Sequence, residues 1–175
     1  MQKSTESWGT LGVALAVPFV AAVVGGVATS SSVSTWYRRL RKPDWNPPTW
    51  VFAPVWNLLY LLMGLASWLV WRQRQTTKGW FGHVDEEKRN EVDSALRLYG
   101  IHLIFNALWS VIFFGLRRVD WALAEILVLW SLIFSTLTRF GRIDARAGWL
   151  LVPYQAWATF ATFLNFTVWR MNRSN

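Results

Sequence analysis

The sequence contains no cysteine and only two histidines among its 175 residues. Disulfide bonds and thiolate metal sites are therefore excluded, and His83 and His102 are too few for a histidine metal cluster. The sequence also has no glycine-rich phosphate loop and no nucleophile elbow. We therefore expect neither a metal ion nor a bound cofactor.

Charged residues are scarce as well. They make up 16% of the chain, whereas hydrophobic residues make up 53% and tryptophan alone occurs 14 times. An ordinary soluble domain has roughly 25% charged residues. The net charge of +8 could indicate a nucleic-acid partner, but the cations lie at the ends of apolar runs rather than on one face. That pattern is typical of membrane flanks, where cations attract anionic lipid headgroups, so we expect membrane lipids and no nucleic acid as partners.

Five apolar runs are long enough, or nearly so, to cross a membrane, which takes about 20 residues. They cover residues 11–29, 50–71, 98–116, 121–138 and 149–169. We predict one all-α domain, residues 1–175, folded as an integral membrane bundle of five transmembrane helices. The first run could instead be a cleaved signal peptide, but it lacks a basic n-region and is long for an h-region.

The connections between these runs are short, apart from residues 72–97. The second half of that loop could form a short amphipathic helix. Five spans place the two termini on opposite membrane faces. The two sides carry similar numbers of Lys and Arg, so the positive-inside rule does not set the orientation.

Three of the predicted helices carry stripes of aromatic and polar residues at helical spacing. The stripes are Ala53, Trp56, Tyr60, Met63 and Ser67; His102, Asn106, Trp109 and Phe113; and Tyr154, Trp157, Ala161 and Asn165. Any single stripe could be plain helix packing. Three stripes together favour a cavity for a flat, largely apolar ligand, with aromatic faces to stack on it and a few polar groups to orient it.

Two other features lie within the runs. Glu125 is the only acid in any of them, and it sits near the start of its helix. In the first run, Ala21 and Ala22 each precede a glycine by four residues. Such small residues allow close helix approach, either inside the bundle or at a homodimer seam.

The loop before the second run is unusually rich in proline. The stretch "WYRRLRKPDWNPPTWVFAPVW", Trp36 to Trp56, holds four of the six prolines. Because proline locks φ and restricts the residue before it, Pro43 through Pro48 should form a nearly rigid connector. Trp45 and Trp50 should lie at headgroup level. The loop is either a fixed lid over the cavity or an interfacial anchor.

The same stretch, extended to "NLLY", resembles the signature of the TspO/MBR family, which comprises translocator proteins, tryptophan-rich sensory proteins and peripheral-type benzodiazepine receptors. "FNALWS" in the third run and "LLVPYQAWATFATFLNFTVWRMN" in the fifth are similar to this family too. The resemblance covers about Trp36 to Asn172. It implies a five-helix membrane protein that usually dimerises. It also implies a pocket under the first loop for porphyrins, sterols and benzodiazepine-type or isoquinoline drugs.

By these motifs, together with the stripe on the third helix, the expected ligand-binding residues are Tyr37, Pro47, Trp56, Tyr60, His102, Asn106, Trp109, Trp157 and Ala161. The resemblance implies that the protein binds protoporphyrin-type tetrapyrroles in sensing or transport. An alternative is an enzyme that degrades porphyrin in light, with Trp56 and Trp157 as its tentative catalytic residues. A second alternative is a translocator of sterols or lipids.

One position departs from the animal members of the family. They carry a proposed cholesterol motif with a tyrosine near the end of the last helix, where this chain has Phe166. The departure places sterol recognition at that site in doubt, since such motifs are weak patterns in any case. We therefore expect a bacterial member in a cell-envelope membrane; a eukaryotic member would lie in the mitochondrial outer membrane.

Overall fold

The computed structural model describes residues 2–74 and 85–173, and these residues form five long helices without any strand. The helices are α1 (Gln2–Ser32), α2 (Thr49–Gln73), α3 (Glu86–Ser110), α4 (Val119–Ile143) and α5 (Ala145–Asn172). A π-helical turn, η1 (Val33–Tyr37), continues α1, and a second one, η2 (Val111–Gly115), continues α3.

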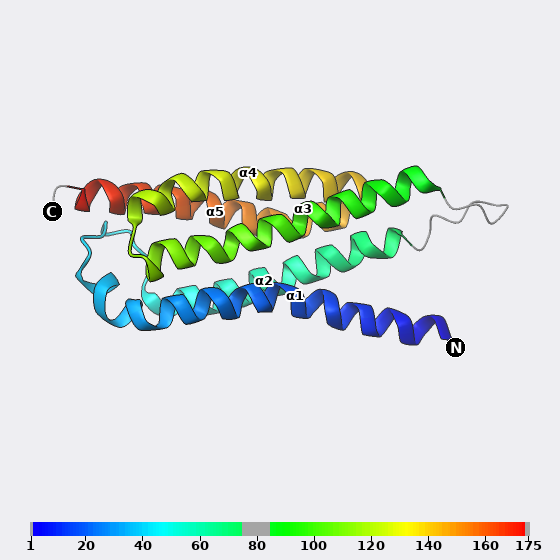
Figure 1. Cartoon of the computed structure of the whole chain (residues 1–175), viewed down its shortest axis with the longest axis horizontal. Helices are drawn as coiled ribbons and strands as arrows, with labels where there is room; N and C mark the ends of the chain where they lie inside the picture. Colours follow the sequence, from blue (N-terminus) through cyan, green and yellow to red (C-terminus); the bar gives the residue numbers. More distant parts are fainter. Residues whose placement is uncertain (1, 75–84, 174–175) are drawn as a thin grey trace.

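The helices run side by side along one axis, and the start of α1 lies at the opposite end of the bundle from the end of α5 (Figure 1). Glycine sets the closest approaches between neighbours. A Cβ atom added to Gly148 in α5 would lie 2.7 Å from the Cα atom of Gly141 in α4. A Cβ atom added to Gly64 in α2 would lie 2.9 Å from the backbone oxygen of Ala14 in α1. Both distances are too short for a side chain, so these helix pairs meet backbone against backbone.

Four segments of the described chain are long and apolar enough to cross a membrane: Trp8–Ser30, Thr49–Gln73, Glu86–Gly115 and Val119–Ile143. Only 17% of the most apolar part of the first segment is buried, and Val20 and Val27 are 64% and 70% exposed. Such an outward apolar surface suits lipid and not water. The chain is therefore an integral membrane protein. The helix α5 is long enough but more polar, because Gln155, Asn165 and several threonines interrupt its apolar residues.

The predicted helices were too short at several ends, most clearly at the start of α3. Residues 86–97 do not form a separate amphipathic helix, because they are the first turns of α3 itself. The Asp85 carboxylate accepts a hydrogen bond from the Lys88 backbone N–H at 3.2 Å, which caps the helix. Glu86 and Glu87 follow in the first turn, where negative charge favours the helix N-terminus. Capping and charge therefore start this helix well before its apolar part begins.

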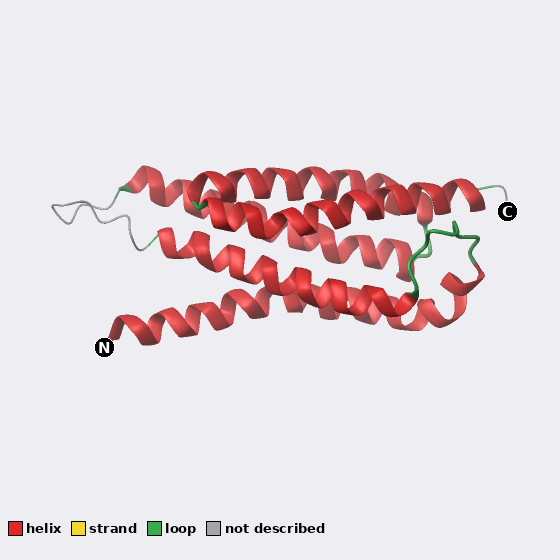
Figure 2. Ribbon diagram, turned by 180° about the vertical axis from the view of Figure 1, so that it is seen from behind, coloured by secondary structure: helices red, strands yellow, loops and turns green. Residues whose placement is uncertain are grey.

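The first loop joins η1 to α2 at the end of the bundle where α5 ends (Figure 2). The backbone of residues 40–48 is neither helix nor strand. The two π-helical turns lie at this same end, and the Ser32 hydroxyl donates a 2.7 Å hydrogen bond to the Phe114 carbonyl between them. π-helical turns are rare and occur frequently at functional sites.

Candidate functional site

A cavity of about 470 Å³ lies inside the half of the bundle next to the first loop. Every helix contributes to its wall. The lining residues include Gly25, Gly26 and Ser30 of α1, Tyr37 of η1, Thr49, Phe52, Trp56 and Tyr60 of α2, Asn106, Trp109, Ser110 and Phe113 of α3 and η2, Ile126 and Leu129 of α4, and Tyr154, Trp157, Phe160, Ala161 and Asn165 of α5. The volume falls within the range of about 300–1,000 Å³ that is typical of small-molecule pockets.

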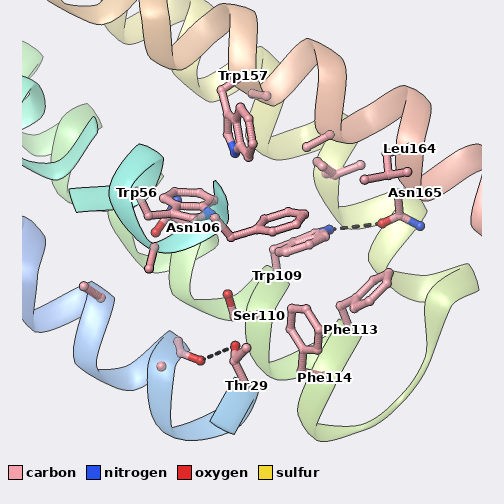
Figure 3. A pocket seen from close by; sticks show the side chains of 18 of the residues that line it. Thr29, Trp56, Asn106, Trp109, Ser110, Phe113, Phe114, Trp157, Leu164 and Asn165 are labelled. Atoms are coloured by element: carbon pink, nitrogen blue, oxygen red, sulfur yellow. Dashed lines mark hydrogen bonds between the residues drawn. The ribbon is translucent and has the colours of Figure 1, made fainter. Parts of the chain in front are cut away.

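Three indole rings project into this space from three different helices: Trp56, Trp109 and Trp157 (Figure 3). The Trp157 ring contacts Phe52 edge-on, with ring centroids 5.8 Å apart. The Trp109 ring stacks on Phe113 at 5.0 Å. The aromatic neighbours hold the indoles in place while part of each ring still faces the cavity, which is the arrangement that a flat ligand needs.

A hydrogen-bonded bridge across three helices forms the floor of the cavity. The Tyr60 hydroxyl of α2 donates to Oδ1 of Asn106 in α3 at 3.1 Å. Nδ2 of Asn106 donates to the Tyr154 hydroxyl of α5 at 2.7 Å. All three side chains are buried, so the bridge satisfies polar groups that lipid or protein interior would otherwise leave unpaired.

His102 lies outside the cavity, although the sequence placed it on the same helix face as Asn106. It is fully buried one turn further from the first loop, where its ring packs against Tyr154 at 5.6 Å. Nδ1 lies 3.1 Å from the Thr136 hydroxyl, and that hydroxyl already donates its proton to the Leu132 carbonyl. The contact between the imidazole and this hydroxyl ties α3 to α4.

Asn165 of α5 acts as a second polar bridge near the first-loop end. Its Oδ1 accepts a hydrogen bond from Nε1 of Trp109 at 3.1 Å (Figure 3). Its Nδ2 donates to the Val119 carbonyl at the start of α4. Asn165 is 2% exposed, so it fixes the orientation of the Trp109 indole from a buried position. The helix packing and the cavity wall depend on the same amide.

The phenol of Tyr37 forms part of the wall under the first loop. Its hydroxyl donates to Oδ1 of Asn46 at 3.0 Å, and burial raises the pKa of the phenol, so Tyr37 stays a neutral donor. The Lys42 ammonium lies 4.8 Å from the Tyr37 ring centroid and donates to the Tyr37 and Leu40 carbonyls at 2.7 and 2.8 Å. Pro47 does not line the cavity, although the Asn46 amide binds its carbonyl.

The first loop is fastened to the far end of α5. The Arg41 backbone N–H donates to Oδ1 of Asn172 at 3.1 Å, and Nδ2 of Asn172 donates back to the Arg41 carbonyl at 2.9 Å. The Trp45 ring meets Phe160 edge-on, with centroids 5.9 Å apart. Phe160 lines the cavity. The loop therefore bridges from α1 to α5 across this end of the cavity.

The wall formed by α1 had no counterpart among the predicted site residues. Gly25 packs against α3, since a Cβ atom there would lie 3.1 Å from the Ser110 hydroxyl oxygen. Gly26 lines the cavity with nothing near its missing side chain. The small-residue pattern predicts close packing either inside the bundle or at a homodimer seam. The contact of Gly25 with α3 lies inside the bundle.

Glu125 is 8% exposed and does not line the cavity. Neither of its carboxylate oxygens has a hydrogen-bond partner among the described residues. The described chain also contains no group of three or more His, Asp or Glu residues that could hold a metal ion.

Comparison with known proteins identifies the family. The TspO/MBR family matches residues 14–170. The "Tryptophan-rich protein TspO" of Chlorobaculum tepidum is 39% identical over 162 residues, which cover 93% of this chain and 92% of the relative. The "Tryptophan-rich sensory protein" of Cereibacter sphaeroides is 40% identical over 91% of this chain and 92% of its own length. The human "Translocator protein" is 37% identical over 89% of this chain and 85% of its own length. With its all-helical membrane fold and its tryptophan-walled cavity, the chain belongs to the TspO/MBR family.

Proposed function

We propose that this protein binds porphyrins of the protoporphyrin IX type, and related flat apolar molecules, in the cavity beside the first loop. The observation that carries the proposal is the wall itself, where indole rings from α2, α3 and α5 face the same cavity. A porphyrin offers two broad aromatic faces, and aromatic faces stack favourably in offset or edge-on arrangements. The few polar groups in the wall are amides and hydroxyls, which can orient a ligand without repelling its apolar ring.

The physiological role that follows is tetrapyrrole sensing or transport at a membrane. One relative is named as a sensory protein and another as a translocator, which supports sensing or transport in general. No nucleophile paired with a base appears among the cavity residues, so binding explains the site more simply than acyl or phosphoryl transfer does.

Residue Ala161 allows a direct test, because it lines the cavity on α5 between Trp157 and Asn165. The substitution Ala161→Phe places a phenyl ring in the ligand space and should weaken protoporphyrin IX binding at least tenfold. The matched control is Ala156→Phe, on the outward face of the same helix, and it should bind like wild type. Quenching of tryptophan fluorescence measures both affinities. Equal affinity in a folded Ala161→Phe variant would place the ligand elsewhere.

Light-dependent breakdown of porphyrin is the second candidate function. The observation that favours it is that Trp56 and Trp157, two easily oxidised indoles, both face the cavity. Phenyl keeps a stacking face but is far harder to oxidise. The double variant Trp56→Phe/Trp157→Phe should therefore keep its affinity within about tenfold, or 1.4 kcal/mol, and lose pigment breakdown under illumination. Breakdown at the wild-type rate in this variant would mean that the two indoles only line the cavity and take no part in the reaction.

We further propose that α5 crosses the membrane together with the other four helices. It packs along α4 for much of its length, from the Gly141–Gly148 contact to the 2.8 Å hydrogen bond between Nε1 of Trp130 and the Thr159 hydroxyl. Five spans place the termini on opposite faces. Reporter fusions at the two ends should therefore report opposite sides, and agreement between them would exclude five spans. That two copies of the chain form a homodimer remains a prediction from the family resemblance.

A further inference from the structure

Glu125 is a buried acid within the membrane-spanning helix α4. It is 8% exposed, and both of its carboxylate oxygens are buried without a hydrogen-bond partner among the described residues. An ionised carboxylate without a partner is very costly to bury, and a neutral carboxyl group still leaves polar atoms unsatisfied. Packing therefore gives no reason for an acid at this position. Acids inside membrane proteins commonly serve the movement of protons or ions.

The Glu125 side chain lies directly behind the cavity wall. Ala122, almost one turn earlier on α4, packs against Tyr37 and Phe113, and both of these side chains line the cavity. Leu129, about one turn later, lines the cavity itself. Residues three and four positions apart share one face of a helix. Glu125 therefore faces inward between two parts of the cavity wall.

The elements around Glu125 supply no counter-ion to it. The helix α4 packs against α2, α3, η2 and α5. In the apolar parts of these elements and in η1, the titratable side chains are Tyr37, Tyr60, Tyr99, His102 and Tyr154. His102 is the only one of them that can become a cation, and its partner Thr136 lies eleven residues, or about 16 Å, further along α4. Arg170 of α5 and Asp120 of α4, nearer the first loop, have exposed side chains.

Without a counter-ion, an ionised Glu125 depends on water, and the cavity beside it is open to water at one end. Thr49 lines the cavity and is itself exposed, so the cavity reaches the surface near the first loop. An apolar ligand that fills the cavity displaces this water. The carboxyl group is then favoured only in its neutral form. Entry of the ligand draws a proton from solvent onto a Glu125 carboxylate oxygen, and departure of the ligand returns it.

We infer that Glu125 is a proton-binding site that couples the entry of an apolar ligand into the cavity to the uptake of one proton. This inference rests on the proposed function, because it needs the ligand to occupy the cavity. By linkage, the proton strengthens ligand binding by the same factor as the ligand strengthens proton binding. The protein binds its ligand more tightly at low pH and releases it as the pH rises. Proton-driven transport requires coupling of this kind.

The test uses protoporphyrin IX dimethyl ester, whose blocked carboxyl groups do not titrate, and the protein in nanodiscs of zwitterionic phosphatidylcholine. Tryptophan quenching measures the affinity from about pH 5 to about pH 9, which covers ordinary and strongly buried glutamates. Wild type should bind the ester about tenfold more weakly at the alkaline end, because one coupled proton changes the affinity by up to about tenfold per pH unit. A pH-indicator dye in weakly buffered alkaline solution should also report proton uptake when the ester binds.

The decisive variant is Glu125→Gln, which keeps the shape of the side chain and stays neutral at every pH. It should bind the ester at every pH as tightly as wild type does at low pH, and it should take up no proton. The matched control is Asp120→Asn, which removes an exposed acid from the same helix and should keep the wild-type pH dependence.

Three results would overturn the inference. Wild type could bind the ester equally well at every pH without proton uptake. The pH dependence could persist in Glu125→Gln, which would assign the proton to another group. Glu125→Gln could bind weakly at every pH, which would make Glu125 a structural support of the wall. The proton count on wild type decides the matter even if the variant does not fold. None of these results affects the cavity proposal, which fails only if Ala161→Phe binds the ester normally.

Discussion

The contact between Asn172 and Arg41 should control how fast a ligand leaves the cavity. It is the point where the first loop is hydrogen-bonded to α5, and it joins residues 131 positions apart. Substitution of Asn172 by alanine removes both hydrogen bonds to the Arg41 backbone. It creates neither a packing void in the helix bundle nor a new charge. Asn172 also donates to the Val168 carbonyl of its own helix at 2.7 Å, a bond that does not touch the loop.

The expected size of the effect follows from those two bonds. One intramolecular hydrogen bond contributes about 0.5–1.5 kcal/mol net, which gives about 1–3 kcal/mol for the pair. Asn172 is only partly buried, so water can replace part of each bond and the lower end of this range applies. About 1 kcal/mol corresponds to a release rate roughly fivefold faster, since 1.4 kcal/mol is a factor of ten.

The assay is stopped-flow displacement of bound protoporphyrin IX, followed by the recovery of tryptophan fluorescence. The control is Asn90→Ala, an exposed amide on α3 at the opposite end of the bundle, which should release the ligand at the wild-type rate. The ring contact between Trp45 and Phe160 remains in the Asn172 variant. For this reason we expect faster opening and not loss of the loop structure. An unchanged release rate in folded Asn172→Ala protein would show that the loop does not gate the cavity.

Three further substitutions have defined outcomes. Gly64→Ala should lower the free energy of unfolding by about 1–3 kcal/mol, because its Cβ atom would lie 2.9 Å from the backbone of α1. Gly12→Ala meets no atom and should not lower the stability in thermal denaturation, because alanine favours the helix more than glycine does. Arg117 has φ 57°; Arg117→Gly should be more stable than Arg117→Val by about 1–2 kcal/mol in the same assay, because a β-branched residue is strained there. Replacement of Pro47 and Pro48 by glycine should loosen the loop and speed ligand release more than it slows entry, which stopped-flow mixing measures; equal changes in both rates would indicate an anchor.

The sequence contained enough information to predict the helices, but not their ends. Long apolar runs predicted all five helices, because membrane spans require them. The charged turns that begin α3 at Glu86 carry no apolar signal, since they extend the helix beyond the apolar segment. Hydrophobicity marks the part of a helix that contacts lipid, whereas capping and backbone hydrogen bonding decide where it begins.

The cavity wall was predictable wherever large side chains recur at helical spacing. Trp56, Trp109 and Trp157 were found in this way, and all three line the cavity. Angular spacing says nothing about depth along the bundle, which is why His102 shared a face with Asn106 and yet lies below the floor. The small-residue pattern of α1 predicts close helix packing but does not place Gly25 and Gly26 at the cavity wall. Contacts such as that between Asn172 and Arg41 join distant parts of the chain, so only the folded structure brings them together.

The central claim is that the space between the indoles of α2, α3 and α5 is where the ligand binds. An experimental structure of the protein with protoporphyrin IX, in nanodiscs and in the dark to prevent breakdown, tests it most directly. We predict density for the macrocycle in contact with Trp56, Trp109 and Trp157. Density on the lipid-facing surface of the bundle, with the cavity empty, would contradict the account.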